Sequence, residues 1–283
     1  MKRIHTVVLR LCALVALGPA ALAAQGVLVA PTGIFIDSHT RGGSVELYNP
    51  GADPVEVSIS TAFGYPVSDS LGRITLYLDS APDSTRPSAA AWVDAYPRRL
   101  IMRPRERRTV RLFVRPPANL PDGEYWSRLI VDAKGGQVAV QSPASSSGIQ
   151  VGLALEVRTI VGVFYRKGRA STGVEMSGAR ARVSHDSLTV CARFTRQGSA
   201  AFLGAMHATL TDRTGKQVAS LSSPLAVYYT LAPCMQATVP ALVPGRYVVH
   251  LLVDTNRDDL KREALLPITP VRDSLVITVP ASR

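Results

Sequence analysis

"GIQVGLALEVRTIVGVFYRKG", residues 148–168, begins with a strict alternation of apolar and other side chains. In an extended chain one side carries all five apolar positions, which are Ile149, Val151, Leu153, Leu155 and Val157. A two-residue period is typical of a β-strand and not of a helix. The apolar run that follows, residues 160–165, is interpreted as a break in this register. The sequence predicts a strand with one apolar face, which packs either into its own core or against a partner.

The amino terminus has the composition of a secretory signal peptide. Three basic residues precede an apolar run from Leu11 to Leu22, and small residues follow it. We predict that residues 1–24 are the signal peptide, cleaved after Ala23 or Ala24. The run is shorter than the roughly 20 residues of a membrane helix, and no later segment qualifies. We therefore expect a periplasmic protein without stable membrane insertion.

Export limits what the positive charge can mean. The chain has 32 basic and 21 acidic residues, and without the signal peptide 29 basic residues remain against 21 acidic ones, a net charge of +8. Export argues against nucleic acid as a partner, and the densest basic stretch, Arg98 to Arg115, lacks regular aromatic spacing for base stacking. This stretch either binds an acidic envelope polymer or an acidic protein, or only solvates the outer face of strands.

Two cysteines remain after processing, in a compartment where disulfides persist. Cys191 lies in SLTVCARF, which reads as the second strand of a sandwich, and Cys234 lies in APCMQATV, which reads as a later strand of that sandwich. Such strands can be neighbours. We predict a disulfide between Cys191 and Cys234, with two separate buried thiols as the alternative.

The rest of the mature chain reads as short strands separated by turn residues, without helical periodicity. Two segments repeat one pattern: LPDGEYWSRLIVD at 120–132 and LVPGRYVVHLLVD at 242–254 each place a turn with Pro, a Gly and a Tyr before an alternating strand. In immunoglobulin-like sandwiches a Tyr at this place donates a hydrogen bond back to the turn backbone. Tyr125 and Tyr247 therefore indicate one sandwich each.

We predict an all-β protein made of two immunoglobulin-like β-sandwich domains in series after a signal peptide. The segment 168–173, GRASTG, is the expected hinge. The irregular segment 69–95 is expected to be a long loop or a ragged edge strand of the first domain. The predicted divisions are a signal peptide at 1–24, a first sandwich at 25–167 and a second sandwich at 168–283.

No set of residues with catalytic or metal-binding spacing stands out. The four histidines outside the signal peptide have no ligand spacing to another His, Cys or carboxylate. The stretch DTNRDD at 254–259 begins like a calcium loop, but Asp259 stands where the loop needs Gly and Leu265 where it needs Glu. We predict an acidic turn there, and neither enzymatic activity nor a cofactor nor a metal site.

The first domain resembles the PapD-like periplasmic chaperones, which assemble pili by the chaperone–usher route. Four stretches carry the resemblance in the same order. They are APTGIFIDSHTRGGSVELYNPG at 30–51, YPRRLIMRPRERRTVRLFV at 96–114, LPDGEYWSRLIV at 120–131, and the alternating strand that runs into VFYRKG at 163–168.

The resemblance implies a function for the alternating strand. A pilus subunit lacks the last strand of its sandwich, and the chaperone's strand fills the open groove by backbone pairing while alternate apolar side chains enter its pockets. Leu153, Leu155 and Val157 match the pocket-filling positions, and Ile149 and Val151 extend the row. Pilus or surface subunits and an outer-membrane usher are the implied partners.

The sequence departs from the family at two positions. Members of the family clamp the subunit's terminal carboxylate with an Arg in the first strand and a Lys near the FYR segment. Gly33 and Gly162 stand at these positions here. The basic residues that could reach the cleft instead are Arg158, Arg166, Lys167 and Arg169.

Two functions therefore follow from the sequence. The first is a periplasmic chaperone that binds fimbrial or surface subunits by donor-strand complementation through residues 149–157. The alternative is a secreted two-domain β-sandwich protein that binds an acidic surface polymer or a structural partner.

Overall fold

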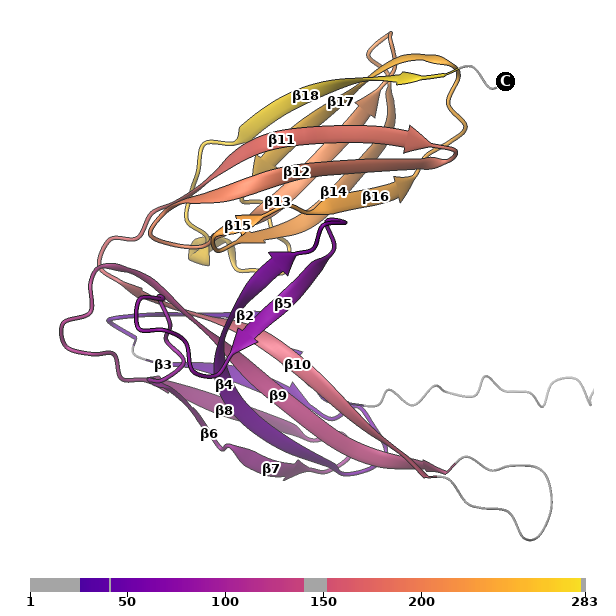
Figure 1. Cartoon of the computed structure of the whole chain (residues 1–283). Coiled ribbons are helices and arrows are strands. Elements are labelled where there is room, and N and C mark those ends of the chain that lie inside the picture. The colour runs from indigo at the N-terminus through magenta and orange to yellow at the C-terminus, as the bar shows by residue number, and fades with distance from the viewer. Residues whose placement is uncertain (1–25, 41, 140–151, 281–283) are drawn as a thin grey trace, which may run out of the picture.

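The computed structural model describes residues 26–40, 42–139 and 152–280, and these fold almost entirely into strands (Figure 1). The predicted signal peptide lies outside the described residues, as do Ile149 and Val151. Within these ranges there is no α-helix and one turn of 3-10 helix, η1 (Arg262–Ala264). No helix of the described residues is long and apolar enough to cross a membrane. The predicted all-β class is confirmed.

The first ten strands form two facing sheets. One sheet has the order β1-β3-β8-β6, with β1 (Leu28–Ala30), β3 (Gly42–Tyr48), β8 (Arg107–Val114) and β6 (Val93–Tyr96). The other has the order β2-β10-β9-β4-β5, and β7 also pairs with β4. Its strands are β2 (Gly33–Asp37), β10 (Gly152–Lys167), β9 (Gly123–Ala139), β4 (Val55–Ser68), β5 (Ile74–Asp79) and β7 (Arg99–Met102). β2 runs parallel to β10, and the other pairs of named strands in the two sheets are antiparallel.

The core of the first sandwich follows the two-residue period of its strands. In β8, Val110, Leu112 and Val114 are buried, whereas the intervening side chains face solvent. The arginines between Arg98 and Arg115 are all exposed, as expected for side chains on the outer face and in the turns. The dense positive charge does not disturb the core, because these arginine side chains are exposed to solvent.

The remaining strands form the second sandwich, also from two sheets. One sheet contains β11 (Thr172–Ser184), β12 (Ser187–Gly198), β15 (Thr230–Leu231) and β16 (Cys234–Thr238), with β15 and β16 both paired to β12. The other has the order β14-β13-β17-β18, with β14 (Gln217–Val227), β13 (Phe202–Thr211), β17 (Gly245–Asp254) and β18 (Val271–Val279). Residues 168–171 connect β10 to β11, within the segment expected to be the hinge.

Both predicted tyrosine corners are present. The Tyr125 hydroxyl donates to the Pro121 carbonyl at 2.9 Å, and the Tyr247 hydroxyl donates to the Val243 carbonyl at 2.9 Å. Each tyrosine ties the start of its strand, β9 or β17, to the preceding turn. The repeated pattern in the sequence thus corresponds to the same local structure in each sandwich.

The predicted disulfide is also confirmed. Cys191 on β12 and Cys234 on β16 are register partners and are joined by a disulfide, with Cα atoms 4.1 Å apart. Cys191 is buried and Cys234 is half-buried. The bond ties the short strand β16 to the long strand β12.

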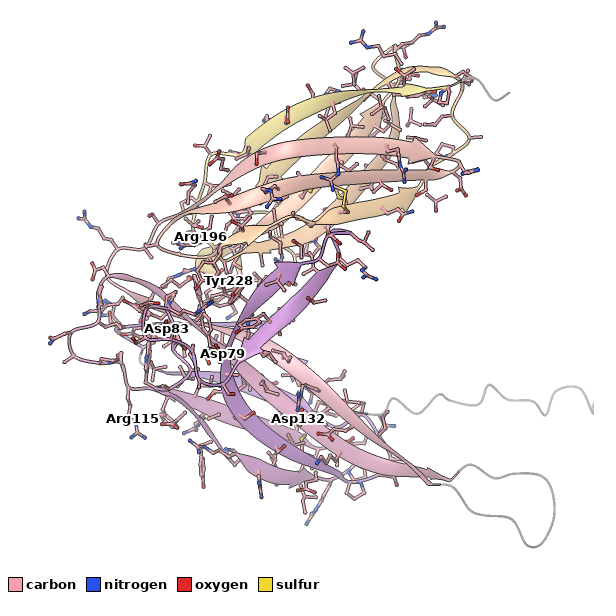
Figure 2. The ribbon with its side chains drawn as sticks, in the orientation of Figure 1. Asp79, Asp83, Arg115, Asp132, Arg196 and Tyr228 are labelled. Atoms are coloured by element: carbon pink, nitrogen blue, oxygen red, sulfur yellow. A yellow bond between two sulfur atoms is a disulfide. The ribbon has the colours of Figure 1, made fainter. Side chains whose placement is uncertain are left out.

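A third apolar cluster lies where the two sandwiches meet. It joins Phe63, Trp126 and Phe164 of the first sandwich to Leu203 and Tyr228 of the second. The Trp126 and Tyr228 rings meet edge to face at 4.7 Å, and Figure 2 places Tyr228 at this junction. Aromatic burial of this kind stabilises the contact between the domains.

The segment 69–95 is partly strand and partly loop. It contains β5, which is the edge strand of its sheet and forms a hairpin with the far end of β4. The expectation of an edge strand is therefore confirmed for residues 74–79. Figure 1 shows this hairpin rising from the first sandwich toward the second.

Candidate partner-binding edge

β10 has a free edge along its first part. β9 pairs with β10 along its whole length, whereas β2 pairs with β10 only from Gly162 to Arg166. In the part of the chain that the structure describes, residues 152–161 of β10 have no strand on the side opposite β9. Their backbone N–H and C=O groups on that side are therefore available for an added strand.

One face of β10 is covered by the core of the first sandwich at one end of the strand and is exposed at the other. Val161, Val163 and Tyr165 are at most 2% exposed and pack in the first sandwich. Toward the free edge, Val157 is half-buried beside Gly26, and Leu155 is 39% exposed. The apolar row predicted from the alternation thus extends beyond the core that covers its other end.

The interpretation of a register break after Val157 is wrong. β10 pairs with β9 without irregularity from Leu155 to Lys167, and its one register shift lies between Ala154 and Leu155. Residues 160–165 are apolar on both sides because both sides are covered here. Val163 faces the core of the first sandwich, and Phe164 faces the cluster between the sandwiches.

The face of β10 opposite the apolar row is polar near the free edge. Arg158 donates to both carboxylate oxygens of Asp132 on β9, at 2.6 and 3.1 Å, and this hydrogen bonding raises the pKa of the guanidinium. Lys134 pairs with Glu156 at 3.7 Å. Arg158 is thus engaged in an exposed ion pair with the neighbouring strand β9.

Arg166, by contrast, lies between the two sandwiches. Its Nε donates to the buried Glu124 carboxylate at 2.7 Å, and its Nη1 donates to the Ala264 carbonyl of the second sandwich at 2.6 Å. The guanidinium also lies over the Phe35 ring, 5.1 Å from its centroid. Of the basic residues proposed for the cleft, Arg166 is the one with contacts to both domains.

A cleft of about 460 Å³ opens beside Arg166. Its walls come from β2 and the turn after it and from the η1 segment of the second sandwich, including Asp37, Thr40, Lys261 and Glu263. Hydrogen bonds from the Thr40 and His39 backbone lower the pKa of the Asp37 carboxyl. The cleft therefore presents both signs of charge next to the Phe35 ring.

The other two basic candidates lie elsewhere. Lys167 donates from Nζ to the Leu120 carbonyl, at the turn before β9. The backbone N–H of Arg169 donates to Asp122 at 3.3 Å. Both contacts are local to the end of the first sandwich.

The two glycines at the expected anchor positions are register partners in the parallel β2–β10 pair. A Cβ atom on Gly33 would lie 2.8 Å from Leu260 Cδ2, and one on Gly162 would lie 2.8 Å from Phe164 Cε2. The Phe35 and Phe164 rings stack beside them at 4.8 Å. Aromatic and aliphatic packing thus occupies the space that two long basic side chains would need.

Sequence reasoning missed two charged residues at this junction. Glu124 is fully buried and accepts hydrogen bonds from Trp126 Nε1 at 2.8 Å and from the Ala201 N–H at 3.0 Å. Arg128 on β9 lies over the Tyr228 ring at 4.9 Å and donates to the Gly64 carbonyl. The Gly-Glu-Tyr motif contained Glu124, but its partner Arg166 lies 42 residues away, so the ion pair has no local signal.

Comparisons with known proteins find matches among solved structures. No family model matches the chain, and no curated protein does. The matching structures include a chaperone alone and chaperones in complex with a pilus subunit.

The CsuC–CsuE chaperone–tip adhesion subunit pre-assembly complex of Acinetobacter baumannii matches at 13% identity, covering 87% of this chain and 97% of the other, with a TM-score of 0.44. The YadV chaperone matches at 16% identity, with coverages of 89% and 99% and a TM-score of 0.42. The Salmonella enterica SafA pilin with the SafB chaperone matches at 14% identity, with coverages of 88% and 96% and a TM-score of 0.41.

Proposed function

We propose that this chain is a periplasmic chaperone that holds pilus or surface subunits by donating β10 to a sandwich that lacks its last strand. The observation that carries the proposal is the free edge of β10 beside an apolar row that leaves the core at Leu155. A missing-strand subunit needs both features, because unpaired backbone groups and apolar pockets run together along its groove. Strand donation by β10 involves no catalytic step.

Leu153, Leu155 and Val157 are the side chains proposed to enter the client's pockets, with Ile149 and Val151 extending the row. Each leucine transferred from water into a pocket contributes about 1.5–3 kcal/mol, and backbone pairing adds affinity independent of the client's sequence. In the free protein the edge is exposed, which is a hazard for self-association that a client removes.

Of the basic residues considered for the cleft, Arg166 is the one proposed to lie nearest a bound client. It lies beside the cleft lined by β2 and η1, but Glu124 and Ala264 already engage its guanidinium. We therefore expect recognition to depend mainly on the apolar row and the backbone edge, and less on a charge clamp.

Capture of a defined subunit domain tests this function. The mature chain is mixed with a recombinant subunit domain of the missing-strand type and with the same domain fused to its own last strand. We expect a stable 1:1 complex with the first and none with the second, because the fused strand fills the groove. Equal binding to both domains, or to neither, would contradict strand donation.

Export is part of the proposal. Residues 1–24 are proposed as a signal peptide that sends the chain to the periplasm. Edman sequencing of protein isolated from the periplasm should start at Ala24 or Gln25. A mature protein that begins at Met1 would contradict it.

A second candidate function rests on the exposed arginines. Arg107 lies over Tyr48 at 4.6 Å on the outer face of the β1-β3-β8-β6 sheet, and Arg111 is exposed on the same strand. An acidic surface polymer could bind this face. Replacing Arg105, Arg107 and Arg108 with Gln should then lower retention on heparin and flatten its dependence on salt, whereas unchanged elution would contradict polymer binding.

A further inference from the structure

The β4–β5 hairpin extends beyond the sheet in which it starts. Residues 55–62 of β4 pair with β9, whereas within the described chain residues 63–68 pair with β5 alone. Figure 1 shows the hairpin reaching the second sandwich near β16. An isolated two-stranded hairpin is marginally stable in water, so its tip needs a contact to hold its position.

The tip of the hairpin is a preformed turn. The Asp69 carboxylate accepts hydrogen bonds from the N–H groups of Leu71 and Arg73, both at 2.9 Å, and from Arg73 Nε at 2.7 Å. These bonds lower the pKa of Asp69. Gly72 closes the turn by donating to the Asp69 carbonyl at 3.0 Å. The turn therefore presents the Gly72 carbonyl in a fixed direction.

This turn seats directly on the disulfide-bonded strand. The Cys234 N–H donates to the Gly72 carbonyl at 2.9 Å, and the Ala232 N–H donates to the Ser68 hydroxyl at 2.9 Å. Gly72 has φ +75°, and a Cβ atom there would collide with Cys234 Sγ. No other residue type fits, both because of the backbone conformation and because the sulfur occupies the space.

The place of Cys234 in the β12–β16 register sets the direction of the hydrogen bond that it donates to the hairpin. The Cα atoms of Cys191 and Cys234 are 4.1 Å apart, close to the spacing of an antiparallel pair whose N–H groups point away from each other. The Cys234 N–H therefore points outward from the edge of β16, where the Gly72 carbonyl accepts it. Besides the bond to Cys191, the five-residue strand β16 is held by its pairing with β12 and by the Met235 side chain in the core of the second sandwich.

We propose that the β4–β5 hairpin is an interdomain latch whose seat is the Cys191–Cys234 edge, so that the position of the second sandwich depends on the redox state of this bond. The oxidised bond holds β16 in register and keeps the Cys234 N–H aimed at Gly72. Reduction frees β16 and weakens the seat. The latch is independent of strand donation by β10, because it uses the opposite edge of the sheet.

Hydrogen–deuterium exchange of Gly72→Val, measured on the full mature chain, tests the latch. The matched control is Gly215→Val, since Gly215 has φ +83° in the β13–β14 turn but nothing lies within 4 Å of its Cβ position. We expect exchange at the Cys234 and Ala232 amides to rise at least tenfold in Gly72→Val and to stay unchanged in the control. Small-angle scattering should show a larger radius of gyration for Gly72→Val alone. Unchanged protection of the Cys234 amide would overturn the proposal.

A milder variant covers the case in which Gly72→Val does not fold. Ser68→Ala removes only the hydroxyl that accepts from the Ala232 N–H. Its control is Ser60→Ala, at an exposed position of the same strand. We expect the Ala232 amide to exchange roughly fivefold faster in Ser68→Ala, as the loss of one hydrogen bond implies. Equal exchange in the two variants would contradict the latch.

Reduction tests the dependence on the disulfide. One thiolate of dithiothreitol attacks a sulfur of the bond and releases one cysteine thiolate. The reagent's second thiol then attacks the mixed disulfide and releases the other cysteine, so the reagent leaves as a cyclic disulfide and two cysteine thiols form. We expect the Cys234 amide to lose protection while the β17 amides keep theirs, which shows that the second sandwich is still folded. A reduced, folded protein with a protected Cys234 amide would overturn the redox link.

Discussion

Both ends of β10 carry apolar residues at every second position, but the surroundings of the two ends are opposite. At the end near the second sandwich, Val163 is fully buried, Phe164 packs between the domains, and Arg166 pairs with a buried carboxylate. At the far end, Leu155 is exposed, Arg158 forms an exposed ion pair, and β9 is the one neighbouring strand among the described residues. The alternation tells which side of a strand is apolar, but a second layer or a partner decides whether that side is covered.

The largest expected difference between the two ends concerns their ion pairs. Arg166→Met leaves the Glu124 carboxylate buried without its cation, which should lower the free energy of unfolding by about 3–5 kcal/mol. Arg158→Met removes an exposed pair with Asp132 and should leave the free energy of unfolding nearly unchanged, because solvent screens the pair. Urea unfolding of both variants measures the difference, and equal losses would contradict the contrast.

A second comparison uses the apolar side chains of the same strand. Val163→Ala removes buried methyl groups and leaves a cavity, so we expect a loss of about 2 kcal/mol. Leu155→Ala removes a larger side chain from an exposed position and should cost less than about 1 kcal/mol. If Leu155→Ala proved the more damaging of the two, the far end of the row would belong to the core.

A third, smaller effect tests burial at the junction by pH. Burial raises the pKa of Tyr228 to about 12, above its value near 10 in the unfolded chain. The neutral phenol is thus favoured in the folded state, so this contribution is complete below about pH 10 and is lost as the pH rises toward 12. At pH 11 the wild type should lose roughly 1 kcal/mol of stability relative to Tyr228→Phe. Parallel pH profiles for the two proteins would show that the junction is hydrated.

The sequence predicted the parts of the fold that depend on local patterns. Tyr125 and Tyr247 indicated two sandwiches, because the corner hydrogen bond spans only four residues and so has a local signal. The disulfide could be predicted because Cys191 and Cys234 each lie in a segment that is recognisable as a strand. Residues 160–165 were misinterpreted because their second covered face comes from Tyr228 of the other domain.

The candidate site was predictable only in part. The apolar row of β10 was visible as an alternation, but its exposure at Leu155 depends on where β2 stops pairing, which no local pattern encodes. The pairing of Arg166 with Glu124 and the seat of Gly72 on Cys234 join residues far apart in sequence. Contacts of this kind depend on the packing of the two sandwiches and leave no periodic signal.

The binding affinity of Leu153→Ser with Leu155→Ser for a missing-strand subunit domain tests the central claim most directly. The control is Glu156→Ser, on the opposite face of the same stretch of β10. We expect the double variant to keep its thermal midpoint within a few degrees and to bind more than about 100-fold more weakly, since two leucines leave client pockets, while the control binds like wild type. A double variant that unfolds, or that folds and binds like wild type, would contradict strand donation by β10.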